Sequence, residues 1–97
     1  MITSFADDGT RDIFWGHDTR AARQQCPRLL WPAARKKLDQ LKVAKQVMDL
    51  RRPPGNRVER LKGNWLGFHS MRINDQYRVV FWWLDGAATE VQIVDYH

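Results

Sequence analysis

The segment Pro53-Pro54-Gly55-Asn56 divides the chain into two parts that have different hydrophobic periods. Proline lacks a backbone donor and biases the residue before it toward extended backbone, so any helix must end there. Before this break, apolar residues recur mostly at helical spacing, whereas after it they form short runs rich in β-branched and aromatic residues. The sequence therefore predicts helices in the first half and strands in the second.

Two helices are expected before the break. The polar stretch Asp7–Thr10 can cap a short helix that runs through Arg11–Trp15 and stops at Gly16. A basic amphipathic helix follows from Pro32, with a possible break near Val43 and with an apolar stripe that we assign to the core: Ala34, Leu38, Leu41 and Met48, with Ala44 near the same face. The segment Gln24–Pro27 is interpreted as loop, and Ile2–Phe5 as a short edge strand.

Three strands are expected after the break, at Gly67–Ile73, Tyr77–Leu84 and Thr89–Tyr96. The short breaks at 74–76 and 85–88 favour antiparallel hairpins. The middle strand is apolar on both faces except for Arg78. A buried, unpaired guanidinium is costly, so Arg78 must reach an edge, an acidic partner or a bound anion. An internal ion pair and a role in ligand binding are both open.

Chain length and net charge limit the functions that the protein can have. With 97 residues, we expect one domain that covers residues 1–97. The net charge is +5, and the segment 51–78 alone carries seven basic and two acidic side chains, which accounts for the whole excess. Such a surface favours polyanions, although it is also compatible with ordinary solvation. Cys26 is the only cysteine and is interpreted as a passive core residue, and the absence of a signal-like or bilayer-length apolar run predicts a cytoplasmic protein that does not bind membranes.

Several short motifs occur in a fixed order from the break onward: Pro53-Pro54-Gly55-Asn56-Arg57, Leu61-x-Gly63-Asn64, Gly67-x-His69-Ser70-Met71-Arg72-Ile73-Asn74, Gln76-Tyr77-Arg78 and Val91-x-Ile93-Val94-Asp95-Tyr96-His97. This series resembles the HigB-type killer toxins of the RelE/ParE superfamily. The resemblance implies a small α+β fold, in which two or three N-terminal helices pack on one face of a twisted, mainly antiparallel four-stranded sheet.

The resemblance also implies a function. Such toxins are ribosome-dependent endoribonucleases (mRNA interferases) of type II toxin-antitoxin systems, which cleave mRNA in the decoding site of the ribosome and so inhibit translation, without a metal or another cofactor. A helix-turn-helix antitoxin of the HigA kind would be the cognate partner. Two alternatives remain open, namely a toxin of the ParE type that acts on DNA gyrase and a non-catalytic domain that binds RNA or a partner.

Metal-free RNA cleavage requires a base, an acid and cations, and the motifs contain candidates for each role. We expect His97 to be the general acid, because imidazole populates both protonation states near neutrality. Asp95 would orient His97 or accept the 2′-proton, and Tyr96 would stack on a base or donate to a phosphate. Glu59 stands where some HigB toxins have a histidine, and it is either the base or the ion-pair partner of an arginine.

Cationic and aromatic residues complete the predicted site. Arg78, Lys62 and Arg57 are candidates for neutralising the phosphoryl charge. The residues expected to bind RNA or the ribosome are Arg57, Arg60, Lys62, Trp65 and Arg72. Of the other two histidines, His69 is interpreted as structural and His17 as plain surface. The histidines and carboxylates show no metal-ligand spacing, so no metal is expected.

Overall fold

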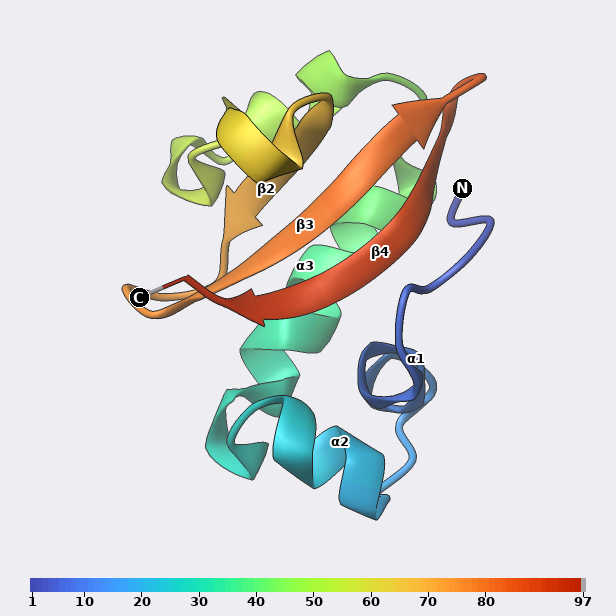
Figure 1. Cartoon of the computed structure of the whole chain (residues 1–97), viewed down its shortest axis with the longest axis vertical. Helices are drawn as coiled ribbons and strands as arrows, with labels where there is room; N and C mark the ends of the chain where they lie inside the picture. Colours follow the sequence, from blue (N-terminus) through green and yellow to red (C-terminus); the bar gives the residue numbers. More distant parts are fainter. Residues whose placement is uncertain (97) are drawn as a thin grey trace.

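The computed structural model describes residues 1–96 and shows a layer of helices against one face of an antiparallel sheet (Figure 1). The sheet order is β1-β2-β3-β4, so every strand pairs with its neighbour in sequence. This confirms the expected α+β fold. The helices are α1 (Asp8–Trp15), α2 (Arg20–Gln25) and α3 (Trp31–Val43), and the strands are β1 (Glu59–Arg60), β2 (Phe68–Arg72), β3 (Tyr77–Leu84) and β4 (Ala87–Asp95).

The predicted limits of α1 are confirmed. The Asp7 carboxylate accepts a hydrogen bond from the Thr10 amide at 2.8 Å, and Gly16 ends the helix with φ 78°, a conformation that glycine adopts without strain. The predicted break near Val43 is also confirmed, because α3 ends there. Within residues 1–96, no helix is long and apolar enough to span a bilayer.

Two predictions about the helical half are wrong. Gln24 and Gln25 belong to α2 rather than to a loop, because the Thr19 hydroxyl accepts from the Ala22 amide at 3.1 Å and so caps a helix there. Met48 is not a core residue. It lies in the short 3-10 turn η2 (Val47–Arg51) and is 66% exposed, since the end of α3 breaks the helical period that placed it on the apolar stripe.

The sheet contains four strands, but the first of them is Glu59–Arg60 rather than the predicted edge strand Ile2–Phe5. The N-terminal segment instead forms isolated parallel bridges with β4, at Ala88 and Val91. It therefore extends the packing of β4 without becoming a strand of the sheet.

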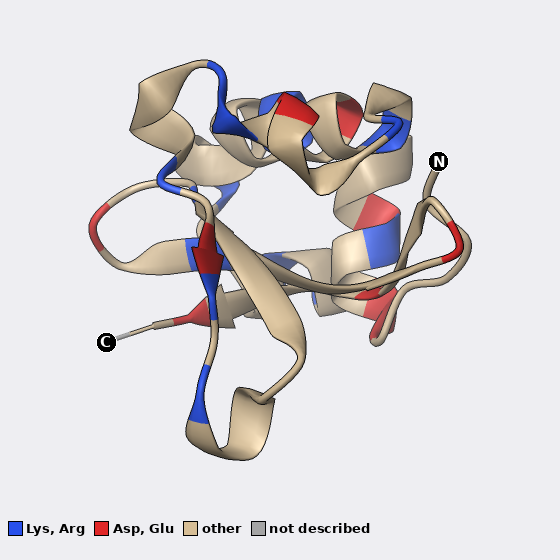
Figure 2. Cartoon of the chain, turned by 90° about the horizontal axis from the view of Figure 1, so that it is seen from above, with Lys and Arg blue, Asp and Glu red and all other residues tan. Residues whose placement is uncertain are grey.

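The two faces of the sheet have different partners. The face toward the helices supplies the main core, in which Val79 and Phe81 of β3 pack with Leu38 and Leu41 of α3. Arg78, Val80 and Trp82 alternate with these residues and so lie on the opposite face. Val80 is fully buried there, and the short turn η4 (Gly63–Trp65) lies on this side of the sheet, away from the helices (Figure 2).

The hairpin turns set the register of the sheet. Asp85 and Gly86, with φ 51° and 77°, form a two-residue turn between β3 and β4, a geometry that Asp-Gly favours. At the other turn, the Asn74 side-chain oxygen accepts from the amides of Gln76 and Tyr77. The resulting register places Arg78 directly between Arg72 of β2 and Val94 of β4.

Candidate functional site

Arg78 is the centre of the candidate site. Its side chain is held from two directions, because Nε donates to the Ser70 hydroxyl at 2.8 Å and Nη2 donates to the Arg57 carbonyl. The residue is only 8% exposed, yet it lies on the sheet face away from the helices. Two of the five guanidinium N–H donors are thus used to fix the orientation of the group.

Glu59 and Tyr96 meet Arg78 on this face. Glu59 Oε1 lies 4.0 Å from Arg78 Nη1, and the Tyr96 ring centroid lies 5.4 Å from the Arg78 guanidinium carbon. The carboxylate comes from β1 and the phenol from the residue after β4, so three strands assemble the cluster. The Glu59 side chain is 54% exposed and Tyr96 44% exposed, which leaves the cluster accessible from solvent. Arg78 therefore has an acidic partner, one of the alternatives that its sequence context allowed.

Asp95 occupies a different position from Arg78. Its cross-strand partner is Tyr77, whose side chain packs against the main core, so the register places Asp95 on the helix side of the sheet. Gln76 Nε2 donates to Asp95 Oδ2 at 3.0 Å. Burial, together with the nearby charge of Asp95, raises the pKa of the Tyr77 phenol. His97, the predicted acid, lies outside the described residues.

Arg57 and Arg72, two of the residues expected to bind RNA, both lie beside Arg78. Arg72 stands opposite Arg78 in the register and forms an ion pair with Asp75. The hydrogen bond and charge of Arg72, with a smaller contribution from the charge of Arg57, lower the pKa of the Asp75 carboxyl. Burial and the charges of Lys36 and Arg72 lower the pKa of Lys37, an α3 residue. Positive charge is therefore concentrated at this end of β2 and β3.

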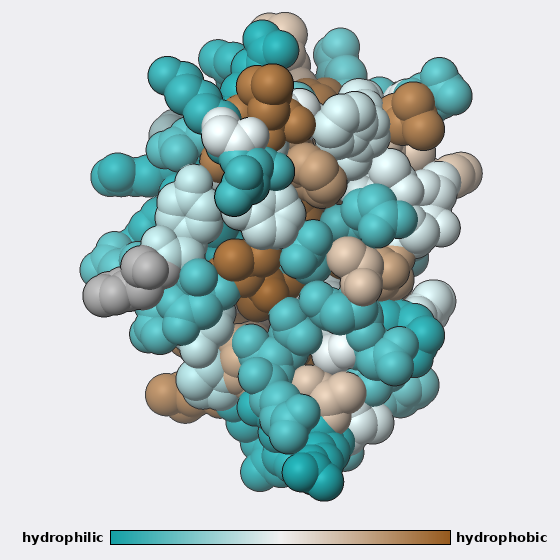
Figure 3. Space-filling view, in the orientation of Figure 1, coloured by the Kyte–Doolittle hydropathy of each residue, from teal (hydrophilic) through white to brown (hydrophobic). Residues whose placement is uncertain are grey.

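The other predicted binding residues form a second group. Arg60 and Lys62 line a hollow of about 290 Å³, and Trp65 packs beside it against Phe68 with ring centroids 5.3 Å apart. Phe68 in turn contacts Trp82 at 5.2 Å. In Figure 3, apolar side chains around η4 are bordered by hydrophilic ones on this face of the molecule. The structure thus divides the predicted RNA-binding residues between the Arg78 cluster and this hollow.

The remaining histidines and the cysteine lie outside the cluster. His69 stacks on Phe81 with ring centroids 5.8 Å apart, and burial together with the charge of Arg60 lowers its pKa. His17 is exposed, while Cys26 is buried, which raises the pKa of its thiol to about 11. These positions agree with the structural and surface interpretations. Among the described residues, no group of three metal-ligating side chains comes together.

Ser70 is a site residue that the sequence analysis missed. It is fully buried and anchors Arg78 through its hydroxyl. A signal was present, because a serine inside a predicted strand needs a hydrogen-bond partner when it is buried. The sequence did not show which side chain that partner is.

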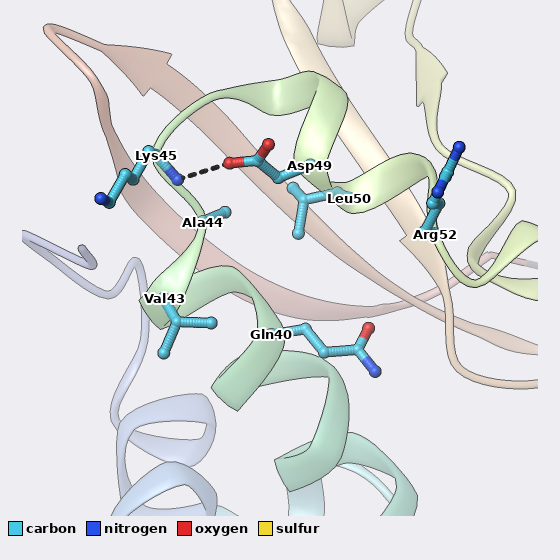
Figure 4. Close-up of a pocket in the computed structure, with 7 residues that line it drawn as sticks. All are labelled: Gln40, Val43, Ala44, Lys45, Asp49, Leu50 and Arg52. Carbon is cyan, nitrogen blue, oxygen red and sulfur yellow. Dashed lines mark hydrogen bonds between the residues drawn. The ribbon is translucent and has the colours of Figure 1, made fainter.

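A hollow of about 380 Å³ between the end of α3 and η2 has a structural explanation (Figure 4). Its carboxylate, Asp49, accepts hydrogen bonds from the amides of Lys45 at 2.9 Å and Gln46 at 3.1 Å. These bonds lower the pKa of the Asp49 carboxyl. The group that could serve as a base is therefore engaged in capping η2, and we place the functional site at Arg78.

The order of these residues along the chain and their arrangement in the fold can be compared with known proteins. Residues 3–97 match the HigB-like toxin family, described as the RelE-like toxin of type II toxin-antitoxin system HigB. The chain belongs to this family. This confirms the resemblance found in the motifs.

Individual relatives agree with the family assignment. This HigB-like chain is 53% identical over 53 residues to Toxin HigB-1 of Vibrio cholerae serotype O1, a match that covers 55% of the chain and 56% of that protein. The chain thus spans little more than half the length of the Vibrio toxin. An uncharacterized protein of Haemophilus influenzae is 31% identical over 77 residues, which cover 79% of the chain and 73% of that protein.

Two solved structures share the fold. They are the YoeB-YefM complex from Staphylococcus aureus and the heterotetrameric YoeB-YefM toxin-antitoxin complex from the same organism. In each, the matched chain superposes with a TM-score of 0.55 at 22% identity, and the match covers 100% of this HigB-like chain and 95% of the other. At this identity, the similarity supports the architecture of three helices on a four-stranded antiparallel sheet.

Proposed function

We propose that this HigB-like toxin is an endoribonuclease that cleaves mRNA in the decoding site of the ribosome by acid-base chemistry without a metal. The observation that carries the proposal is the cluster of Arg78, Glu59 and Tyr96 on the sheet face away from the helices. It brings together a fixed cation, a solvent-accessible carboxylate and an aromatic ring, which suit a phosphate, a 2′-hydroxyl and a base.

The proposed reaction assigns one step to each group. Glu59 takes the proton of the 2′-hydroxyl, and the resulting oxygen attacks the adjacent phosphorus. The bond from phosphorus to the 5′-oxygen breaks, and His97 protonates the departing oxygen. The products are a 2′,3′-cyclic phosphate and a free 5′-hydroxyl. Glu59 is left protonated and His97 neutral, and proton exchange with water restores both.

Arg78 would neutralise the charge that develops on the phosphoryl oxygens. Its orientation is set before substrate binds, because Ser70 and the Arg57 carbonyl hold two of its donors. A preorganised cation of this kind stabilises the transition state without a reorganisation cost. Tyr96, beside Arg78, would hold the nucleotide by stacking or by donating to a phosphate.

Asp95 receives an indirect role in this proposal. Since its register partner is Tyr77 and not Arg78, we assign it to orienting His97 rather than to accepting the 2′-proton. The choice leaves Glu59 as the base. It also makes Asp95 a positioning residue, whose replacement by Asn should change the pH dependence of cleavage more than substrate binding.

The proposal extends to partners. The family description places such toxins in type II toxin-antitoxin systems, and the matched S. aureus structures are toxin-antitoxin complexes. We therefore propose a helix-turn-helix antitoxin of the HigA kind as the neutralising partner. The ribosome and mRNA would be the targets, which places the activity in the cytoplasm, and the excess of seven basic over two acidic residues in segment 51–78 suits both polyanions.

The test compares Glu59→Gln and Arg78→Lys with Arg20→Ala, a control in an exposed position of α2. Each protein is added to programmed ribosomes, and mass spectrometry identifies the cleaved ends. We expect wild type and the control to produce 2′,3′-cyclic phosphate ends. Glu59→Gln and Arg78→Lys should each reduce the rate by about 100-fold, the loss typical of removing a general base or an electrostatic donor.

Two results would contradict the proposal. Full activity of Glu59→Gln with a folded protein would remove Glu59 from the role of base. Growth inhibition without RNA cleavage, accompanied by gyrase-dependent DNA breaks, would instead support a ParE-like function. Thermal unfolding of each variant serves as the control for folding, because Arg78 is buried and its replacement can also destabilise the protein.

A further inference from the structure

The hollow beside η4 has the composition of a small binding site. Leu61, Leu66 and Phe68 supply apolar groups, and Arg60 and Lys62 supply the two charges; Gly67 completes the lining. Among these lining residues, all of which lie in the described part of the chain, none is acidic. The hollow of about 290 Å³ is at the lower end of the size of pockets that bury small ligands.

The aromatic group next to the hollow is held in a fixed geometry. Phe68 contacts Trp65 and Trp82 with interplanar angles of 83° and 75°, so both neighbours meet it edge to face. Gly67 permits this packing, because a Cβ on that residue would lie 2.3 Å from the Trp82 ring. The ring of Phe68 is therefore packed by aromatic side chains on two sides.

Phe68, which lines the hollow, lies on the same face of the sheet as Arg78. Phe68 pairs with Trp82 in the same ladder in which Arg72 pairs with Arg78, and residues two apart on a strand share a face. Trp82 is four positions along β3 from Arg78, a distance of about 13 Å along the strand. A single RNA strand that places one phosphate at Arg78 can thus reach the hollow with a nucleotide further along the chain.

We propose that this hollow is a second nucleotide subsite, which takes a base of single-stranded RNA against Phe68 while Arg60 and Lys62 contact its phosphates. Cations beside an aromatic surface are the combination with which proteins bind single-stranded nucleic acids. The charged lining residues are both cations, which suits the repeated phosphates of RNA. An antitoxin segment would have to supply acidic side chains or backbone carbonyls to pair with them. The inference rests on the proposed function, because it concerns the same RNA.

The test measures RNA binding separately from cleavage. The probe is a short fluorescein-labelled single-stranded RNA with methylated 2′-hydroxyls, which the toxin cannot cut, and fluorescence anisotropy gives its affinity. The variants are Arg60→Ala/Lys62→Ala and Phe68→Leu, and the control is Arg20→Ala/Lys45→Ala, which removes the same charge at exposed positions outside the hollow and outside segment 51–78. Thermal unfolding checks that each variant is folded.

We expect Arg60→Ala/Lys62→Ala and Phe68→Leu each to weaken binding by about 10-fold, while the control binds within about twofold of wild type. The first variant should also show a shallower salt dependence. Equal weakening in the hollow variant and the charge-matched control would overturn the inference, because it would reduce the effect to overall charge. Unchanged affinity in both hollow variants would overturn it as well.

Other outcomes separate the subsite from the proposed function. Hollow-dependent binding of the probe by a wild-type protein that cleaves no mRNA on ribosomes would support the subsite and contradict the proposed function. If the hollow variants cleave mRNA on ribosomes at the wild-type rate but no longer bind antitoxin, the hollow takes a polypeptide. That result would refute the subsite and leave the endoribonuclease proposal intact.

Discussion

Replacing Ser70 by Ala tests whether Arg78 is held as the structure indicates. Ser70 is fully buried, and its hydroxyl accepts the hydrogen bond from Arg78 Nε at 2.8 Å. Alanine leaves this N–H of a buried cation without an acceptor, and the space of one oxygen atom is too small for a water. Because hydrogen bonds to charged groups are worth about 1.5–3 kcal/mol, we expect Ser70→Ala to lower the free energy of unfolding by about 2 kcal/mol.

Urea unfolding measures this cost. With a denaturant dependence of about 1–3 kcal/mol per molar for small domains, a loss of about 2 kcal/mol should lower the midpoint by about 1 M. The same substitution is then made in an Arg78→Met background, where the guanidinium is gone. There Ser70→Ala should cost less than about 0.5 kcal/mol, which gives a coupling energy of at least about 1.5 kcal/mol between the two side chains.

A control and a functional measurement complete the experiment. Ser4→Ala makes the same chemical change at a partly buried serine that bonds to Thr89, and we expect a cost below about 1 kcal/mol because water can replace the partner. If Arg78 stabilises the transition state as proposed, Ser70→Ala should lower kcat more than it raises KM on programmed ribosomes. A coupling energy below about 0.5 kcal/mol would show that Ser70 does not anchor Arg78.

Three further predictions follow from other contacts. Gly67→Ala should destabilise the protein by about 2–4 kcal/mol, since Gly67 has φ 94° and a Cβ would collide with Trp82. In urea unfolding, the added substitution Trp82→Leu should recover part of this loss. An equal loss with and without Trp82 would exclude the collision as its cause. Glu59→Gln should change the free energy of unfolding by less than about 0.5 kcal/mol, because its contact with Arg78 is 4.0 Å long and solvent-exposed; a loss above about 1 kcal/mol would make Glu59 a structural residue. Burial and the charge of Arg60 lower the pKa of His69 from its ordinary value of 6.5, so the side chain binds a proton more readily in the unfolded chain. The contribution of neutral His69 to stability is therefore complete above pH 6.5 and is lost as the pH falls below that value. In urea unfolding across this range, wild type should therefore lose more stability than His69→Gln, and equal pH slopes in the two proteins would contradict the assignment.

The local signals in the sequence were sufficient for most elements of the fold. Asp7 and Gly16 identified both ends of α1, and Asp85-Gly86 lies in the predicted break between the last two strands. Such features act over a few residues, so they can be recognised without knowledge of the rest of the chain. The short α2 was missed, because its only strong signal is the Thr19 cap. The strand Glu59–Arg60 was missed because two residues carry no period.

The sequence alone also supplied the candidate site residues, through the order of the motifs and the excess charge of segment 51–78. It did not determine which of them meet. Glu59 is in β1, Arg78 is in β3 and Tyr96 follows β4, so only the register of the sheet brings them together. Asp95, one residue before Tyr96, is paired with Tyr77 on the other face. The physical reason is that strand pairing and side-chain alternation act across the whole sheet. A shift of one residue in the register would exchange the two faces and dissolve the cluster.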